Sequence, residues 1–137
     1  MESNAINSIR AAVDTALDAH ASTLSHSYNV APEQYEAGTS YITIGLRDIS
    51  SLVIASVTET VFSYEDLATL ELTFYAPRGD GDAVLRAIID KVKKDLQNST
   101  AGTVSIDDAE VLDVPLDSED SEIAVYLGFK VRDYPEK

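Results

Sequence analysis

The chain has 137 residues, no cysteine and a formal net charge of −14, from 24 acidic and 10 basic side chains. This length suits one domain, and the missing thiols exclude disulfides, thiolate metal sites and cysteine nucleophiles. The acidic balance argues against binding to nucleic-acid phosphates or to anionic membranes, because both need clustered lysine and arginine.

The first segment, from Glu2 to about Leu24, has helical periodicity. Apolar residues recur every three or four positions on one face, with polar residues opposite. They are Ile6, Ile9, Val13, Ala16 and Leu17, followed by His20. The segment begins with neither a basic stretch nor an apolar run, which indicates an amphipathic helix and no secretory signal.

No period survives over residues 25–40, where Asn29, Pro32 and Gly38 interrupt the chain. This pattern predicts an irregular surface loop. Its Tyr28 and Tyr35 either anchor the loop on its own domain or order it against a neighbouring subunit, and both interpretations stay open.

Three strands are predicted next, at residues 41–47, 52–62 and 68–76. The first and third alternate apolar and polar residues, and the second is rich in β-branched residues. Pro77 ends the third strand. After a turn, residues 82–97 carry a stripe of Leu85, Ile88, Ile89, Val92 and Leu96, which predicts a second helix that Asn98 and Ser99 close.

The last third predicts a hairpin of two strands. Apolar residues from Val104 to Leu116 share one parity with Asp108 and Glu110, so we expect a bulge near Asp107 and Asp108. Residues 123–131 alternate regularly, and a frayed tail is expected over 133–137. The connection between the strands is acidic, with Asp117, Glu119, Asp120 and Glu122.

These elements predict one domain of residues 1–137 in the α+β class. Their order is α-β-β-β-α-β-β, with one mostly antiparallel sheet and both helices packed on one face. No run of about 18 apolar residues is present, so no membrane span is expected.

Sites for chemistry are not evident in the sequence. His20 and His26 match no metal motif and are expected to be structural, and no nucleophile-elbow sequence occurs. The acidic connection lacks the glycine and flanking helices of an EF-hand, so we expect a solvated loop with no metal. We predict no catalytic residue, no cofactor and no enzyme activity.

Contact surfaces are the remaining class. The polar faces of two predicted strands mix aromatic side chains with both signs of charge, which suits subunit or tube contacts but is equally typical of a solvated sheet. These residues are Thr69, Glu71, Thr73, Tyr75, Tyr126, Lys130 and Arg132.

The order of elements resembles the tail terminator, or minor tail protein U, family of long-tailed phages. The resemblance rests on the alternating stretch 67–77 that closes on Pro77, the helix to Gln97, and the final hairpin of residues 107–134 with its acidic connection. It covers nearly the whole chain, although this sequence lacks tryptophan and has a longer stretch between its first and third strands.

The resemblance implies a structural virion protein rather than an enzyme. Members form a ring, usually of six subunits, that caps the tail tube, ends its polymerisation and joins the tail to the head. The implied partners are further copies of the chain, the tube protein and a head–tail connector or neck protein, with DNA only as passing cargo and no membrane. The implied location is the head-proximal end of the virion tail, after assembly in the host cytoplasm.

In that setting Asp117, Glu119, Asp120 and Glu122 are candidates for an acidic lumen wall that DNA slides past. Two alternatives remain: another head–tail neck or completion adaptor, and a small acidic cation- or ligand-binding module.

Overall fold

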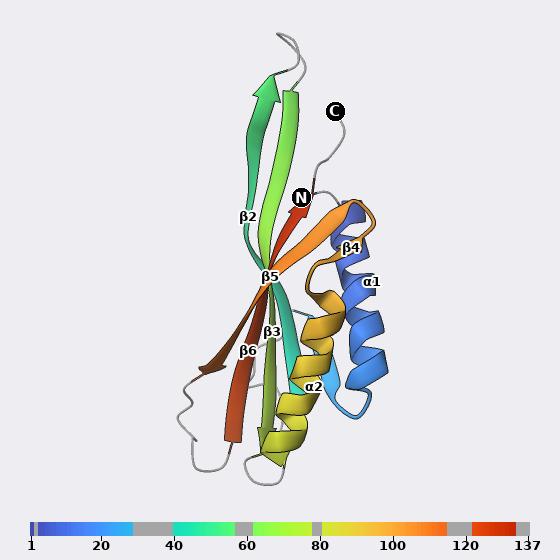
Figure 1. Cartoon of the computed structure of the whole chain (residues 1–137), viewed down its shortest axis with the longest axis vertical. Coiled ribbons are helices and arrows are strands. Elements are labelled where there is room, and N and C mark those ends of the chain that lie inside the picture. The colour runs from blue at the N-terminus through green and yellow to red at the C-terminus, as the bar shows by residue number, and fades with distance from the viewer. Residues whose placement is uncertain (2, 29–39, 57–61, 78–80, 115–121, 134–137) are drawn as a thin grey trace.

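The structure is a computed structural model that describes residues 1, 3–28, 40–56, 62–77, 81–114 and 122–133. Two helices lie on one face of a six-stranded sheet (Figure 1). The α+β class and the placement of both helices on one face are therefore confirmed. The elements are α1 (Ser3–His20), β1 (Ser25–Tyr28), β2 (Tyr41–Ser56), β3 (Phe62–Pro77), α2 (Gly81–Leu96), β4 (Ser99–Ala101), β5 (Val104–Val114) and β6 (Glu122–Asp133).

The strands follow the order β1-β2-β3-β6-β5-β4 across the sheet. All neighbouring pairs are antiparallel except β1 and β2, which run parallel. The mostly antiparallel sheet is thus as predicted. β3 lies near the centre, between β2 and β6.

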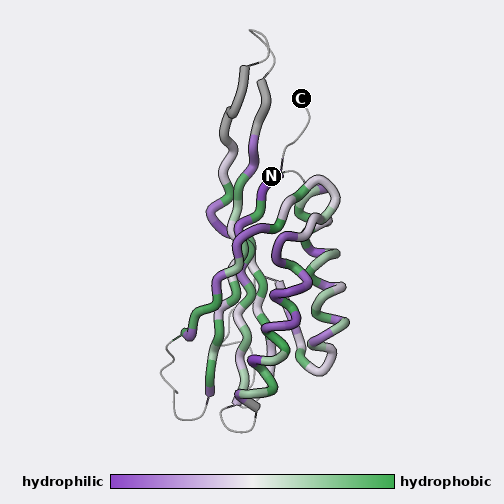
Figure 2. The backbone as a smooth tube through the Cα atoms, in the orientation of Figure 1, coloured by the Kyte–Doolittle hydropathy of each residue, from purple (hydrophilic) through white to green (hydrophobic). Residues whose placement is uncertain are grey.

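The core lies between the sheet and the helices. From Asp66 to Ala76 every second residue of β3 is buried, and its cross-strand partners on β6 are buried as well. Each fully buried aliphatic or aromatic side chain stabilises the fold by about 1.5–3 kcal/mol. Figure 2 shows hydrophobic positions alternating with hydrophilic ones along both helices. The buried cross-strand pairs between β3 and β6 are Ala68 with Val131, Leu70 with Phe129, Leu72 with Leu127, Phe74 with Val125, and Ala76 with Ile123.

Both helices bury the predicted stripes. Ile9, Val13, Ala16 and Leu17 of α1 and Leu85, Ile89, Val92 and Leu96 of α2 are buried. The two helices are joined by His20, whose Nε2 lies 2.6 Å from Asp95 Oδ2. α1 ends at His20, four residues before the predicted end.

The predicted closure of α2 by Asn98 and Ser99 is confirmed. Asn98 has φ of 59°, and the Ser99 hydroxyl donates to the Leu96 carbonyl at 2.6 Å. This left-handed residue is a common end for a helix and leads directly into β4.

The predicted first strand and residues 52–56 of the predicted second form one strand, β2, so the break between them was wrong. Residues 57–61 of the predicted second strand lie outside the described residues, and its last residue, Phe62, begins β3. The register shifts between Arg47 and Ser50, where exposed Asp48 has φ of 55°. A bulge of this kind changes which face each later residue occupies without ending the strand. In the sequence such a bulge interrupts the alternation of apolar and polar residues in the same way as a turn between two strands.

Two further boundaries were also wrong. Residues 25–28 of the predicted loop form β1, which pairs in parallel with Tyr41–Ile44 of β2. Asp133, placed in the frayed tail, belongs to β6 and is buried, where it accepts a hydrogen bond from Thr103 at 2.5 Å. The rest of both segments, 29–39 and 134–137, lies outside the described residues, as does Tyr35.

The bulge predicted near Asp107 and Asp108 is confirmed. The register of β5 against β6 shifts between Asp107 and Ala109, and Asp108 has φ of 39°. Its height in the sheet matches that of the Asp48 bulge, because Arg47, Thr69, Lys130 and Asp107 form one cross-strand row.

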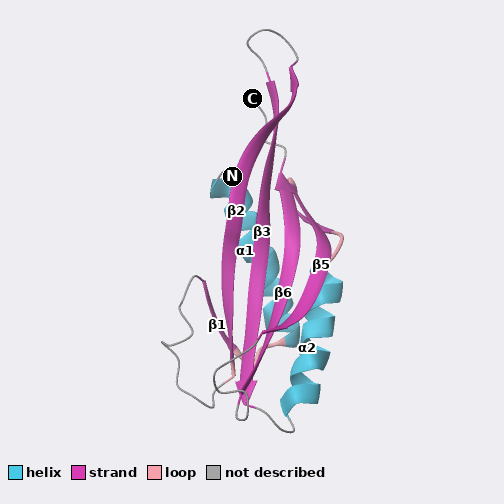
Figure 3. Ribbon diagram, turned by 90° about the vertical axis from the view of Figure 1, so that its left-hand side faces the viewer, coloured by secondary structure: helices cyan, strands magenta, loops and turns pink. Residues whose placement is uncertain are grey.

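Beyond Asp66, which pairs with Asp133 at the end of β6, β2 and β3 continue as a two-stranded arm that extends past the other strands (Figure 3). None of the helices in the described part of the chain is long and apolar enough to span a membrane.

The left-handed conformation of Asp48 predicts a selective sensitivity to substitution. Asp48→Val should lower the free energy of unfolding by about 1–2 kcal/mol, because a β-branched residue fits this conformation poorly. Asp48→Asn and Asp48→Gly should stay within about 0.5 kcal/mol of the parent chain. Urea unfolding midpoints measure this, and equal losses for valine and asparagine would contradict it.

Candidate interaction surface

The sheet face opposite the helices is covered by no described helix or strand (Figure 3). We call it the open face. On β3 it carries the odd-numbered residues from Leu67 to Tyr75, and on β6 the even-numbered residues from Ala124 to Arg132. Ala124 and Gly128 are buried, but the other side chains are half-buried or exposed and mostly polar, so this face can contact a partner without refolding.

All seven predicted contact residues lie on the open face. Thr69 pairs with Lys130, Thr73 with Tyr126, and Leu67 with Arg132 across the β3–β6 ladder. Lys130 is exposed and the other six are half-buried. The structure therefore brings these side chains together, while their role as contacts stays a prediction.

Glu71 is the centre of a polar network on this face. The Arg47 Nε lies 2.5 Å from Glu71 Oε2, and the Tyr126 hydroxyl donates to Glu71 Oε1 at 3.3 Å. Gly45 and Gly128 flank Glu71 in the same cross-strand row. A Cβ on Gly128 would collide with the Tyr126 ring, so glycine lets that ring lie flat on the sheet.

Further contacts surround this network. Arg132 lies 3.2 Å from Glu65 and 3.6 Å from Asp107, and the rings of Tyr41 and Tyr75 stack with centroids 4.6 Å apart. Salt bridges as exposed as these add little to stability, but they fix the directions of the charged groups.

The environment of Tyr126 shifts its acidity. Burial raises the pKa of the Tyr126 phenol to about 12, and the nearby negative charge of Glu71 raises it in the same direction. The phenol is therefore neutral at physiological pH and remains a hydrogen-bond donor.

Arg47, Gly45 and Gly128 were missed as parts of this surface. Arg47 and Gly45 share the parity of Thr43 in the predicted first strand, which places them on the polar side. That parity was a usable signal for Arg47. The role of Gly128 depends on the rotamer of Tyr126, which the sequence does not specify.

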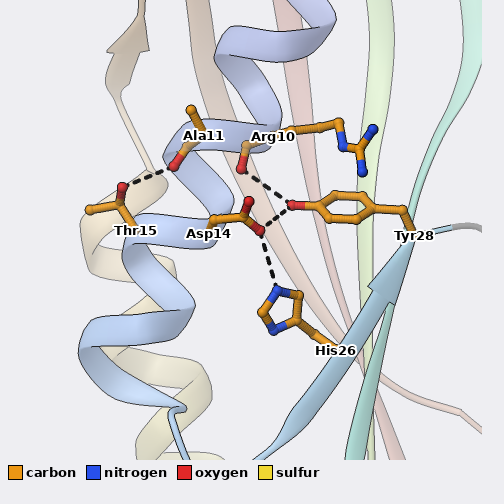
Figure 4. Close-up of polar contacts among 6 residues, drawn as sticks. All are labelled: Arg10, Ala11, Asp14, Thr15, His26 and Tyr28. Carbon is orange, nitrogen blue, oxygen red and sulfur yellow. Dashed lines mark hydrogen bonds and ion pairs between the residues drawn. The ribbon is translucent and has the colours of Figure 1, made fainter.

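Tyr28 anchors β1 to α1 (Figure 4). Its hydroxyl donates to Asp14 at 2.6 Å, the guanidinium of Arg10 lies 4.1 Å from its ring centroid, and His26 Nε2 lies 3.2 Å from Asp14. Burial and the hydrogen bond to Asp14 raise the pKa of the Tyr28 phenol above its ordinary value. Tyr28 therefore packs on its own domain, and both histidines bind carboxylates of other elements, as expected of structural residues.

The acidic connection is mostly outside the described residues. Asp117, Glu119 and Asp120 fall within 115–121, and only Glu122 is described, at the start of β6 opposite Pro77. Within the described part of the chain, no three acidic or histidine side chains are grouped as a metal site requires. A lumen-facing or cation-binding role for the connection stays a prediction.

Comparisons with known proteins find solved chains with a similar fold. The structure matches a chain of a native gene transfer agent virion with a TM-score of 0.57, 16% identity and 98% and 100% of the two chains covered. It also matches the sheath/tube terminator of an extracellular contractile injection system in its extended state, with a TM-score of 0.55 and 15% identity. The alignment covers 100% of this chain and 59% of the terminator chain.

A further solved chain, known only by an identifier, matches with a TM-score of 0.59, 13% identity and 96% of both chains. No family model and no curated protein matches the sequence. Identities this low show a common fold and nothing finer. The fold of the chain therefore resembles that of a sheath/tube terminator, as the order of the predicted elements indicated.

The raised pKa of Tyr126 predicts a late titration. Subtracting the alkaline ultraviolet titration of Tyr126→Phe from that of the parent chain should isolate one phenol with a midpoint of about 12. Glu71→Gln should lower that midpoint by removing the nearby charge. Because the folded state holds this proton more tightly, its contribution to stability is complete below about pH 10 and is lost as pH rises towards 12. A midpoint near the ordinary value would contradict the described environment.

Proposed function

We propose that the chain is a structural protein of a phage or phage-like tail, which forms a ring, of six copies, on the finished tail tube. The ring ends tube polymerisation at the head-proximal end of the tail and joins the tail to a head–tail connector or neck protein. DNA passes through the ring as cargo, and assembly takes place in the host cytoplasm.

The observation that carries this proposal is the alignment of the whole chain with a sheath/tube terminator, at a TM-score of 0.55. The gene transfer agent chain supports the same setting, because its entire length aligns with this fold inside a virion. Neither neighbour is named as an enzyme. The proposal extends their setting to this chain, which spans about three fifths of the terminator chain.

The surface chemistry suits such a role. The open face offers Arg47, Glu71, Tyr126 and Lys130 as polar contacts for a tube or a neighbouring subunit. Assembly interfaces that form between already folded parts have a comparable mixture of aromatic and charged groups. A net charge of −14 on each copy also keeps the ring from holding the DNA that passes through it.

A neck or completion adaptor is the second candidate, favoured by the match to a virion chain whose position in the particle is not named. Electron microscopy of particles made without the chain separates the two functions. Overlong tails mean that termination has failed, whereas tails of normal length detached from heads mean a joining defect. We expect overlong tails, and intact particles of normal length would exclude both functions.

The net negative charge of each copy predicts how the assembly of the ring depends on salt concentration. Copies that each carry −14 repel one another, so the assembled fraction should rise between about 50 mM and about 500 mM salt as screening shortens the range of repulsion. Native mass measurement across a concentration series tests this. Assembly that weakens with salt would show that ion pairs between copies outweigh the net repulsion.

A further inference from the structure

The two outer strands of the sheet, β1 and β4, are short. Each pairs with only a small part of its neighbouring strand, so most of the outer edge of that neighbour has no described partner strand. β1 covers β2 only at Tyr41–Ile44, and β4 covers β5 only at Val104–Ile106. Among the described residues no strand pairs with the outer edges of β2 and β5 beyond these points. Unpaired backbone donors and acceptors in such rows are ready to accept another strand.

The edge of β5 has the character of a docking strand. Val111 and Leu112 are 41% and 49% exposed, and they point to opposite faces of the sheet, because Val111 pairs with Leu127 and Leu112 with Tyr126. Exposed Asp108, Glu110 and Asp113 lie beside them. A strand with aliphatic groups on both faces and an acidic margin calls for a partner with an apolar hollow and cations.

The uncovered edge of β2 has those features. A cavity of about 100 Å³ lies where β1 stops, and it is lined by residues of α1, β1, β2 and β3. It is smaller than a cofactor site of 300 Å³ or more, and its size suits a single aliphatic side chain. Its lining includes Ile6, Ile9 and Arg10 of α1, Tyr28 of β1, and Gly45 and Leu46 of β2.

We propose that β5 of one copy pairs antiparallel with the uncovered edge of β2 of a second copy, with Val111 seated in this cavity. The inference rests on the proposed ring, and it names the contact that would build it. A contact between two different edges of the same chain is head-to-tail, so its repetition closes a ring when the rotation from one copy to the next divides a full turn, and gives an open filament otherwise.

One antiparallel register satisfies both faces of the sheet. With Val111 opposite Leu46, Glu110 falls opposite Arg47 and Leu112 opposite Gly45. Val111 and Leu46 then share the helix face, where the cavity lies. On the open face, Glu110 meets the guanidinium of Arg47, whose side chain is 70% exposed, and Leu112 covers a glycine.

β1 sets the position of the added strand. Because β1 already occupies Tyr41–Ile44, pairing with β5 of the second copy ends where Leu112 lies opposite Gly45. Asp113 and Val114, the last two residues of β5, must bend away from β2 there. This limit staggers neighbouring copies along the strand direction. Closed sheets require such a stagger, since it tilts the strands against the axis of the ring.

Cross-linking tests the contact, and the absence of cysteine from the chain makes it specific. Val111→Cys chains are mixed with tagged Leu46→Cys chains. The mixture is oxidised in solution at high protein concentration, and a second sample is oxidised on tail tubes. We expect disulfide-linked pairs of tagged and untagged chains. Leu112→Cys with Leu46→Cys is the matched control, because a one-residue offset puts the two thiols on opposite faces.

Substitutions test the same contact without thiols. Val111→Asp should raise the concentration needed for half-assembly about tenfold or more, since it buries a carboxylate in an apolar cavity. Val84→Asp is the control, because Val84 is 61% exposed on α2 and belongs to neither edge. Circular dichroism should show that both variants keep the parent fold.

The outcomes distinguish this contact from the proposed function. A parent ring with no Val111–Leu46 cross-link, and with Val111→Asp rings as stable as those of Val84→Asp, would overturn the contact and leave the function standing. A parent chain that neither assembles nor cross-links, in solution or on tubes, would overturn both. Equal cross-linking in the offset control would also refute the register.

Discussion

The alternation along β3 is the constraint on which the rest of the structure depends. Leu70, Leu72 and Phe74 are buried under the helices, so Glu71 and Thr73 must point to the other side. Because β3 pairs with both β2 and β6, this one strand fixes the faces of its neighbours as well. A slip of one residue would bury Glu71 and expose Leu72, at a cost of several buried side chains. The open face is thus a consequence of core packing.

The two bulges protect the partly uncovered edges of β2 and β5 against unspecific strand pairing. Asp48 on β2 and Asp108 on β5 lie at one height, and each interrupts its strand with a left-handed residue. Bulges and charges are the usual protection of an open edge, and β5 adds Glu110 and Asp113 to them. These acids repel a second β5 strand. They also favour an edge with cations, as that of β2 has in Arg47 and in the neighbouring Arg10 of α1.

The sequence carried enough information for the parts that follow a regular period. Both helical stripes, the alternation of β3 and β6 and the bulge near Asp107 could be predicted, and so could the open-face positions from Thr69 to Arg132. The continuity of β2 could not, since the Asp48 bulge disrupts alternation as a turn does. β1 is held by Tyr28 contacts with Arg10 and Asp14 on a distant element, and no local pattern encodes such contacts. The cavity beside Leu46 likewise exists only once α1 packs on the sheet.

Edge pairing and charge together suggest why a ring of this chain would close on the tube rather than in solution. The proposed contact is short, and the repulsion between copies of charge −14 opposes it at physiological salt. A tube end that binds each copy through the open face would hold neighbours at high effective concentration, so a weak edge contact becomes sufficient. The polar network around Glu71 suits this step, because a hydrated polar surface stays soluble when free and still complements a partner. Under the proposed function, assembly is then confined to the place where a terminator acts.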